Sequence, residues 1–498
     1  MVEESLANLL QARGRVPRRR FLALTTAGMA ALLASCTPAA APAPTSAPQA
    51  TEVAKPVATT APAPAATPAP AATQAPVQSG AAKPFAGVNI NGGMHSHVLA
   101  TTIKGYLPEF EQKTGIKVNL NSPALANYNQ QLDLELSTKG SAYDFASITY
   151  GVAGRWMSAG WFTSLEDYLK DPNKTPPDFQ PDDFPTSTLS PAMDAKGNRY
   201  GFAWEAGAMI AAAARGDLIE KAGLKMPETF DELEKVLAAV HDQEGCKAFV
   251  ADNLHHWNWP PFLMGFGGKV FKDPPDNMTP TLDSAESIKA ADYYCRLLSK
   301  YTPEGVLSYT DDQCISAQQN SRANYRSSVI AFLAPIGDPE KSKTAKTVKY
   351  SLVPGGPAGR FPGSNSNNFG IPLGAKNKDA AWEFIKWALS KEMVMRYVTE
   401  KGYAAPCRLS VINSPEFKKK MTLNGQDVAD LYVQVMQLAG KSGYMKYRIT
   451  PVFSQAGAAI NKAISAVASG QMPAEAAMKQ AQSETVADLK KAGVKMDL

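Results

Sequence analysis

GDLIEKAGLKMPETFDEL, residues 216–233, is the stretch that decides how the rest of the chain is interpreted. Thr229 and Glu232 have the spacing of a capping box, in which each side chain satisfies a free backbone N–H at the start of a helix. The large apolar residues that follow recur on one helical face: Phe230, Leu233, Leu237 and Val240. The stretch therefore predicts an amphipathic helix whose apolar face packs against another layer.

Strand and helix patterns alternate on both sides of this stretch. Ile116–Leu120 and Asp144–Ile148 predict short strands, whereas residues 103–110, residues 288–298 and the segment after Asn377 predict helices, with Asn377 as a cap. Such alternation predicts mostly parallel sheets covered on both faces. Because more than 400 residues exceed one such stack, we expect an α/β protein of two lobes with a ligand cleft between them.

The N-terminus has the features of an export signal. Residues 18–22, RRRFL, open an apolar run and resemble a twin-arginine signal. The run is about 15 residues long, shorter than the roughly 20 that span a bilayer. It ends in Leu33-Ala34-Ser35-Cys36, which resembles a lipobox and implies lipid attachment at the Cys36 thiol. We therefore expect residues 1–35 to be a signal peptide and the mature protein to be anchored outside the cytoplasm, in the periplasm or at the cell surface.

Residues 36–83 are almost entirely Ala, Pro and Thr, a composition that predicts a disordered or extended linker. The net charge of the chain is +5, and residues 1–35, with five arginines and two glutamates, carry +3 of it. The remainder has too little positive charge to predict a nucleic-acid partner.

Further segments resemble, in order along the chain, the family 1 extracellular solute-binding proteins of ABC importers, relatives of maltose-binding protein. Besides residues 216–233 they are FEQKTGIKV (110–118), AGWFTSL (159–165), GNRYGFAWE (197–205) and AAWEFI (380–385). The resemblance implies a two-lobed periplasmic-binding-protein fold of type II. The chain would cross between lobes near Trp204, Arg360 and Ser390. The N-terminal lobe is then 84–204 with 362–391, and the C-terminal lobe is 205–361 with 392–498.

The same resemblance implies a non-enzymatic protein without cofactor, a monomer that closes on its solute by hinge motion and presents it to ABC permease subunits. A sugar requires aromatic platforms and planar polar side chains. Trp257 matches the position of a stacking aromatic, and Glu205 matches an acidic position that binds hydroxyls. The other candidate ligand contacts are Tyr150, Trp259, Trp204, Asn91, Asn367, Asn368 and Arg408.

Two departures from the family pattern argue against a long oligosaccharide. Ala334-Pro335-Ile336 stands where the family has a stacking Trp, and Gly457 stands where a C-terminal aromatic is expected. A smaller sugar or a polyol fits better. Neither His95-Ser96-His97 nor His255-His256 has the companion ligands of a metal site, so we expect none.

Alternatives remain open at this point. The cysteines of the body permit two disulfides in three pairings, of which Cys295–Cys314 is the first expectation; the others are Cys246 and Cys407. A lipid-anchored polysaccharide hydrolase would require a carboxylate pair such as Asp144 and Glu205, although no G-x-S-x-G motif appears. A sensor input module would use the same fold.

Overall fold

The computed structural model describes residues 83–194, 196–207, 210–274, 276–448 and 450–497. The predicted signal peptide, Cys36 and nearly all of the predicted linker lie outside the described residues. Within the part of the chain that is described, no helix combines the length and the apolar character needed to cross a bilayer.

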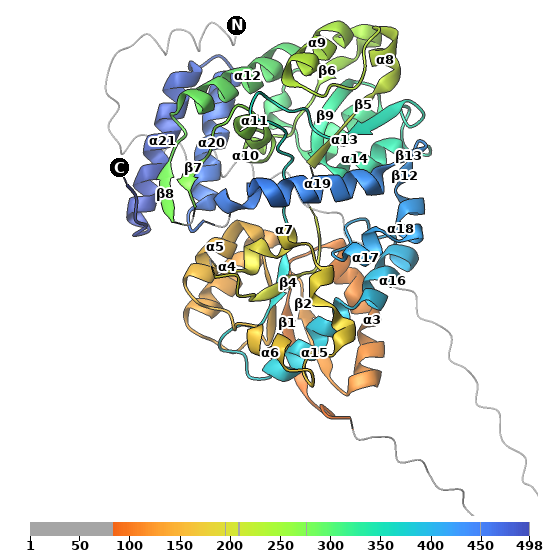
Figure 1. Cartoon of the computed structure of the whole chain (residues 1–498), viewed down its shortest axis with the longest axis vertical. Helices are drawn as coiled ribbons and strands as arrows, with labels where there is room; N and C mark the ends of the chain where they lie inside the picture. The colour runs from red at the N-terminus through yellow and green to blue at the C-terminus, as the bar shows by residue number, and fades with distance from the viewer. Residues whose placement is uncertain (1–82, 195, 208–209, 275, 449, 498) are drawn as a thin grey trace, which may run out of the picture. The chain divides into compact units, whose positions relative to one another are not determined.

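The first sheet has five strands in the order β2-β1-β3-β11-β4 (Figure 1). The strands are β1 (Asn89–Gly93), β2 (Lys117–Asn121), β3 (Phe145–Ile148), β4 (Gly201–Ala203) and β11 (Asn368–Gly370). β1 runs parallel to β2 and β3, whereas β11 runs antiparallel to β3 and β4. Strands from distant parts of the sequence thus meet in one layer.

The second sheet has four strands in the order β10-β5-β9-β6. They are β5 (Ile210–Arg215), β6 (Lys247–Phe249), β9 (Ala323–Val329) and β10 (Val348–Ser351). β6 and β9 are parallel and the other two pairs are antiparallel. The alanines of β5 are buried, because this strand lies between two others. Two short hairpins are separate: β7 (Phe271–Asp273) with β8 (Asn277–Pro280), and β12 (Thr422–Leu423) with β13 (Gln426–Asp427).

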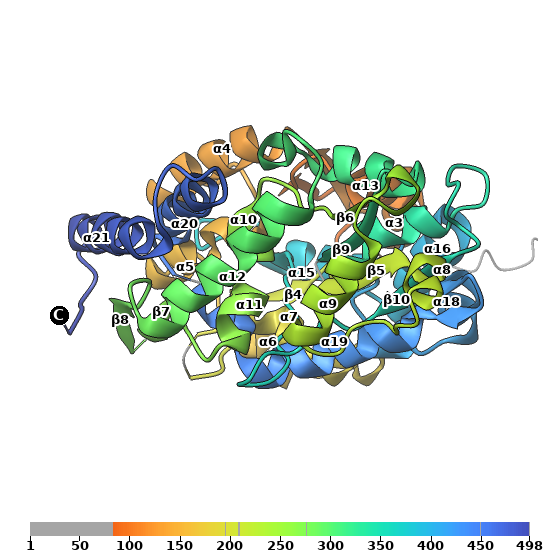
Figure 2. The same ribbon diagram turned by 90° about the horizontal axis from the view of Figure 1, so that it is seen from above.

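Helices cover both sheets. The helices before β5 are α3 (Val98–Thr114), α4 (Leu125–Ser137), α5 (Tyr150–Ser158), α6 (Glu166–Lys170) and α7 (Thr186–Leu189). Between β11 and α19 lie α15 (Lys378–Ala388), α16 (Lys391–Lys401), α17 (Leu409–Ile412) and α18 (Pro415–Lys420). Those between β5 and β10 are α8 (Gly216–Lys221), α9 (Phe230–Val240), α10 (His255–Asn258), α11 (Pro260–Gly265), α12 (Ala285–Tyr301), α13 (Asp311–Gln319) and α14 (Ile330–Leu333). The last three are α19 (Val428–Ser442), α20 (Phe453–Ala468) and α21 (Ala474–Lys491). α20 and α21 lie side by side and pack on α12 (Figures 1 and 2).

Several predictions about local structure are confirmed. The Thr229 side chain accepts a hydrogen bond from the Glu232 backbone N–H, and the Glu232 carboxylate accepts one from the Thr229 backbone N–H, so α9 begins with a capping box. Phe230, Leu233 and Val240 of this helix are buried in the core of the second sheet. The two strands predicted at 116–120 and 144–148 are β2 and β3.

Three predictions are wrong. The sheets are mixed rather than mostly parallel, because β11, β5 and β10 run against their neighbours. The Asn377 side chain makes no cap bond at α15 and instead donates to Asp144 Oδ1 at 3.2 Å. No disulfide joins Cys295 and Cys314: both are buried free thiols, as are Cys246 and Cys407. A thiol on an apolar helical stripe packs as a small hydrophobic side chain.

The segment after residue 391 packs against both hydrophobic cores, one after the other. α16 lies on α3 of the first sheet, where Arg396 Nη1 is 2.7 Å from Glu109 Oε2. Met393 and Tyr397 belong to the same hydrophobic cluster as Ile90 of β1. α20 and α21 instead belong to the cluster of the second sheet. The chain therefore leaves the first core again after α19, and the lobe division at 391 stays a prediction.

Candidate functional site

A cavity of about 510 Å³ lies where segments of both sheets meet. Its first wall comes from residues that flank strands of the first sheet, including Tyr150 after β3, Glu205 after β4 and Asn367 before β11. Its second wall comes from residues that follow β6 and β9, including Asp252, Trp257 and Phe332. The volume is in the range of small-molecule sites.

On the first wall, Asn367 connects two of the predicted site residues. Its Oδ1 accepts a hydrogen bond from the Tyr150 backbone N–H at 3.1 Å, and its Nδ2 donates to Glu205 Oε1. The amide therefore fixes both the start of α5 and the orientation of the Glu205 carboxyl. Because a planar amide has one acceptor and two donors, a single side chain can hold both neighbours.

His97 faces the other oxygen of Glu205, with Nε2 3.6 Å from Oε2. His97 is also the N-cap of α3, where its Nδ1 accepts from the Leu99 backbone N–H at 3.1 Å. Since Nδ1 is an acceptor in this bond, the ring proton of the neutral imidazole lies on Nε2, towards Glu205. Burial lowers the pKa of His97 to about 4, so the ring is neutral at pH 7.

The Glu205 carboxyl is 10% exposed. Burial raises its pKa to about 7, and the hydrogen bond from Asn367 opposes that rise. A carboxyl with a strongly shifted pKa in a cavity is a typical feature of functional sites. Here the carboxyl can accept a proton or a hydrogen bond from a bound molecule.

On the second wall, Trp257 provides an aromatic surface held by two neighbours. The Tyr150 ring meets it edge to face, with centroids 5.2 Å apart. The Arg448 guanidinium carbon lies 3.3 Å from the Trp257 ring centroid, and Arg448 is fully buried. One face of the indole is therefore covered by a cation, which restricts where a ligand stacks.

Asp252 and Asp311 share one cation beneath the second wall. Arg326 Nη2 lies 3.1 Å from Asp252 Oδ2 and also contacts Asp311 Oδ1. Arg326 is fully buried while both carboxylates line the cavity. Burial and the charge of Asp252 raise the pKa of Asp311. Two carboxylates on one guanidinium leave acceptor capacity for hydroxyl or amino groups of a ligand.

Two further polar atoms at the cavity have no hydrogen-bond partner within the described part of the chain: the Tyr403 hydroxyl and Asn365 Oδ1. Tyr403 is 6% exposed and Asn365 is 5% exposed. Leaving such buried groups unpaired costs about 1–3 kcal/mol each. A polar guest in the cavity can supply both missing partners.

Four of the nine predicted ligand contacts line this cavity, namely Trp257, Glu205, Tyr150 and Asn367. Two tryptophans do not. Trp259 is fully buried in the core of the second sheet, because α10 turns it away from the side that carries Trp257. Trp204 is 1% exposed and donates from Nε1 to Ser147 Oγ at 2.9 Å, which makes it part of the first core.

The polar candidates Asn368, Arg408 and Asn91 also lie elsewhere. Asn368 points to the opposite face of β11 from Asn367, where its amide donates to Thr188 O at 3.3 Å. Arg408 is fully buried and pairs with Asp183 at 3.1 Å. Asn91 is exposed on β1 and accepts from Asn119 Nδ2 at 3.2 Å.

Sequence reasoning did not name His97, Asp252, Asp311 or Tyr403 as ligand contacts, whereas Asn365 belongs to the asparagine-rich run 364–370 that contains Asn367. Some signals were present: Asp252 follows a strand as Tyr150 does, and Tyr403 begins the segment YAAP. The carboxylate pair expected for a hydrolase, Asp144 with Glu205, does not form at this cavity. Asp144 accepts from the backbone N–H groups of Asn91 and Asn377, both at 2.9 Å, and does not line the cavity with Glu205.

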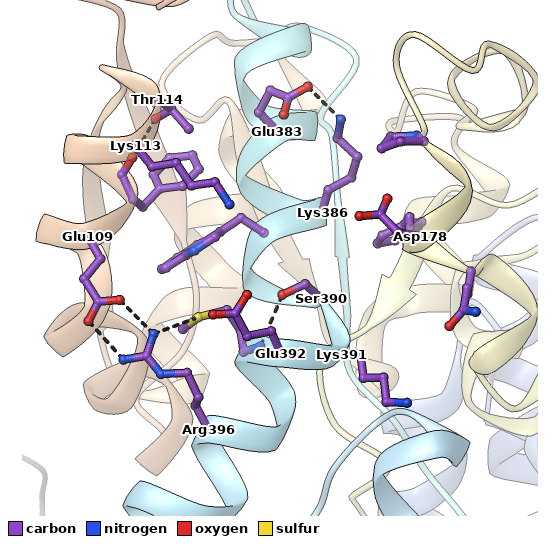
Figure 3. A pocket seen from close by; sticks show the side chains of 16 residues that line it. Glu109, Lys113, Thr114, Asp178, Glu383, Lys386, Ser390, Lys391, Glu392 and Arg396 are labelled. Carbon is purple, nitrogen blue, oxygen red and sulfur yellow. Dashed lines mark hydrogen bonds and ion pairs between the residues drawn. The ribbon is translucent and has the colours of Figure 1, made fainter. Parts of the chain in front are cut away.

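A second pocket, of about 610 Å³, is larger but lies apart from this site (Figure 3). Its walls come from α3, α15, α16 and the turn at Pro177–Phe179. Two of its cations are paired: Arg396 with Glu109 at 2.7 Å, and Lys386 with Glu383 at 2.7 Å. We call it the outer pocket, and the cavity between the two sheets the cleft.

The strand ends of the two main sheets face a shared polar cleft. This arrangement is typical of a protein that binds a small molecule between two halves. Residues 96–395 match the model of the family described as "Bacterial extracellular solute-binding protein", and the chain belongs to this family. Proteins of this family are non-enzymatic components of transport systems. The periplasmic-binding-protein fold expected from the sequence is confirmed.

Individual relatives are distant. The chain is 25% identical to a mannitol-binding protein of Pseudomonas aeruginosa over 73% of its own length and 84% of the relative's. It is 24% identical to a maltotriose-binding protein of Pyrococcus abyssi, over 64% of this chain and 67% of that one. A solute-binding protein of Agrobacterium radiobacter K84, solved with ribitol, superposes with a TM-score of 0.68 at 22% identity, covering 81% of this chain and 99% of that one.

Proposed function

We propose that this protein is exported, anchored to the membrane through a lipid on Cys36, and captures a small sugar or polyol for delivery to an ABC permease. The observation that carries the ligand class is the cleft itself. It combines an indole surface at Trp257 with the carboxyl of Glu205 and the unpaired Tyr403 hydroxyl. Hydroxyl groups of a ligand satisfy the polar atoms, and its C–H groups pack on the ring.

The lining of the cleft region, which lacks two of the expected aromatic platforms, favours one sugar unit or an acyclic polyol over an oligosaccharide. Ile336, at the position of the missing family Trp, is 1% exposed and offers no platform. At Gly457, an added Cβ would lie 3.3 Å from the His256 ring, so the space for an aromatic residue is filled. The names of the relatives that bind mannitol and ribitol are consistent with this preference.

A thermal-shift screen of the purified protein against sugars and polyols tests the proposed ligand class. A ligand at about 100 times its Kd stabilises the protein by roughly 2.7 kcal/mol. We expect at least one monosaccharide or polyol to raise Tm by several degrees, and longer oligosaccharides to have smaller effects. If none of these solutes changes Tm or binds by calorimetry, the proposed ligand class is wrong.

The anchor has its own test. Lipid attachment at Cys36 predicts that Cys36→Ser releases the protein from the membrane fraction, while a serine replacement in the linker, such as Thr37→Ser, leaves it bound. Mass spectrometry of the wild-type N-terminus gives the direct readout. An unmodified cysteine, or membrane retention of Cys36→Ser, contradicts the anchor.

A further inference from the structure

Glu205 is a buried carboxyl that faces a ligand cavity without a cationic partner. Across the described residues its single ion-pair neighbour is His97, whose ring is neutral. The other titratable groups influenced by its charge are three tyrosines and one thiol: Tyr150, Tyr403, Tyr432 and Cys407. None of them supplies a positive charge. Buried carboxylates in proteins are otherwise paired, because an isolated one is costly.

On the opposite wall, two carboxyl groups face one cation. Asp252 and Asp311 share the single guanidinium of Arg326. If both are ionised, this cluster has a net charge of about −1. Carboxyl groups thus face the cleft from two walls that belong to different sheets.

Two further cations lie near the cleft, and among the described residues neither pairs with Glu205. Lys401 lines the rim, but its ammonium lies 5.5 Å from the Tyr106 ring of α3 and is not paired with a cleft carboxylate within the described residues. The Arg448 guanidinium stacks on Trp257, and Arg448 does not line the cavity. Its charge disfavours a second cation on that ring, so a positive group of a ligand is directed away from Trp257.

Unpaired polar atoms mark the position where a ligand group belongs. The Tyr403 hydroxyl and Asn365 Oδ1 line the same cavity, are more than nine-tenths buried, and lack partners among the described residues. Both can accept hydrogen bonds. An ammonium group offers three donors together with a positive charge, whereas a hydroxyl offers one donor and no charge.

We infer that the preferred solute is a hydroxylated amine, an amino sugar or aminopolyol whose ammonium group pairs with Glu205 while its carbon chain lies on Trp257. This inference rests on the proposed function and specifies its ligand class. The hydroxyl groups of the solute then bind Asp252, Asp311 and Asn365. The ligand ammonium supplies the cationic partner that Glu205 lacks among the described residues, so that an ion pair replaces a lone carboxylate.

Matched pairs of probes test the inference on the full chain purified in detergent. The pairs are D-glucamine with D-glucitol, and D-glucosamine with D-glucose, each measured by calorimetry at pH 7.5. We expect the amine of at least one pair to bind about tenfold tighter or more, which corresponds to about 1.4 kcal/mol. Binding of D-glucamine, whose amine is fully protonated at this pH, should also release protons, seen as a dependence of the measured enthalpy on the buffer, because the carboxyl of unliganded Glu205 is partly protonated.

Variants make the test specific. Glu205→Gln should reduce the amine preference to less than about threefold, and Asp311→Asn tests the second wall independently if the first variant fails to fold. Glu392→Gln, which removes a carboxylate of the outer pocket, is the matched control and should preserve the preference.

A neutral probe that binds as tightly as its amine, or an amine preference that survives Glu205→Gln, overturns this inference and leaves the proposed function standing. The proposed function fails separately if no neutral or amino sugar or polyol binds at all.

Discussion

The two pockets of this protein differ more in chemistry than in size. The outer pocket is the larger, about 610 Å³ against 510 Å³. In the outer pocket, Arg396 and Lys386 have their carboxylate partners within 2.7 Å. In the cleft, the described neighbours of the buried Glu205 carboxyl are the Asn367 amide and a neutral histidine, and neither carries a charge.

This difference indicates which pocket is built for a ligand. Surface charges that pair with each other need no further partner and contribute little to binding. Buried polar groups without partners are costly unless a guest satisfies them. The unfilled hydrogen-bonding capacity of the cleft, and not its volume, therefore favours the cleft as the proposed solute site.

The largest expected effect on solute affinity comes from replacing the tryptophan of the cleft, Trp257. Trp257→Ala should weaken solute binding about 30-fold or more, since a central aromatic contact is worth at least about 2 kcal/mol. The unliganded protein should keep most of its stability, because the Trp257 ring is only partly buried. Calorimetry and thermal melting of the same sample measure both quantities.

Trp387→Ala is the control in the outer pocket. Trp387 packs on Phe110 with ring centroids 4.8 Å apart, so the change should lower Tm while Kd stays within about twofold, below the level expected for a ligand contact. A larger loss of affinity from Trp387→Ala than from Trp257→Ala would reverse the assignment of the two pockets.

The second prediction concerns the pH dependence of stability. Burial raises the pKa of Glu205 to about 7 from its usual 4.5. Between these values the folded protein binds more protons at this site than the unfolded chain, so its stability falls as pH rises from about 4.5 to 7. Because Glu205→Gln removes this loss, the variant should gain about 2 kcal/mol relative to wild type between pH 5 and pH 7.5.

Urea unfolding of both proteins at the two pH values measures this difference. His95 and His97, whose pKa values are lowered to about 4 by burial, act in the opposite direction, and taking the difference between variant and wild type removes most of their contribution. An equal pH response in both proteins would show that Glu205 is not desolvated in the unliganded state.

Removal of the unpaired hydroxyl in the cleft should have an intermediate effect. Tyr403→Phe should weaken solute binding about fivefold to tenfold, because one hydrogen bond to the ligand is lost. Stability without ligand should stay equal or rise slightly, since Tyr403 Oη has no partner within the described residues.

Tyr106→Phe provides the contrast. Its hydroxyl donates to Glu400 at 2.8 Å beside the outer pocket, so stability should fall by about 1 kcal/mol without a change in Kd. Identical behaviour of the two variants would mean that the Tyr403 hydroxyl does not meet the solute.

The smallest effect is expected from the charged network of the outer pocket. Arg396→Gln removes the ion pairs with Glu109 and Glu400 at the surface. Exposed pairs contribute at most about 1 kcal/mol, so chemical unfolding should show a small loss and calorimetry an unchanged Kd. A clear loss of solute affinity would connect the outer pocket to binding.

The sequence predicted the fold better than the site, for physical reasons visible in particular residues. Hydrophobic periodicity and capping are local, so α9 and β2 could be predicted from their own residues. The direction in which a side chain points, by contrast, changes with a shift of one or two residues along the chain. Trp257 and Trp259 stand two positions apart, yet one lines the cleft and the other fills the core.

Asn367 and Asn368 show the same difficulty of predicting side-chain direction. Their side chains point to opposite sides of the chain as it enters β11. Other features depend on contacts over long distances in sequence. Arg448 reaches Trp257 across 191 positions, and no local pattern announces that contact. The absence of a cation beside Glu205 is likewise a property of the packed neighbourhood, which only the three-dimensional structure provides.

The most direct test of the cleft as the solute site is a crystal structure of the protein saturated with the tightest ligand from the screen. The account predicts ligand density between Trp257 and Glu205, within hydrogen-bonding distance of Tyr403 Oη and Asn365 Oδ1, with the outer pocket empty of ligand. Density in the outer pocket beside Trp387, with an unoccupied cleft, would contradict it.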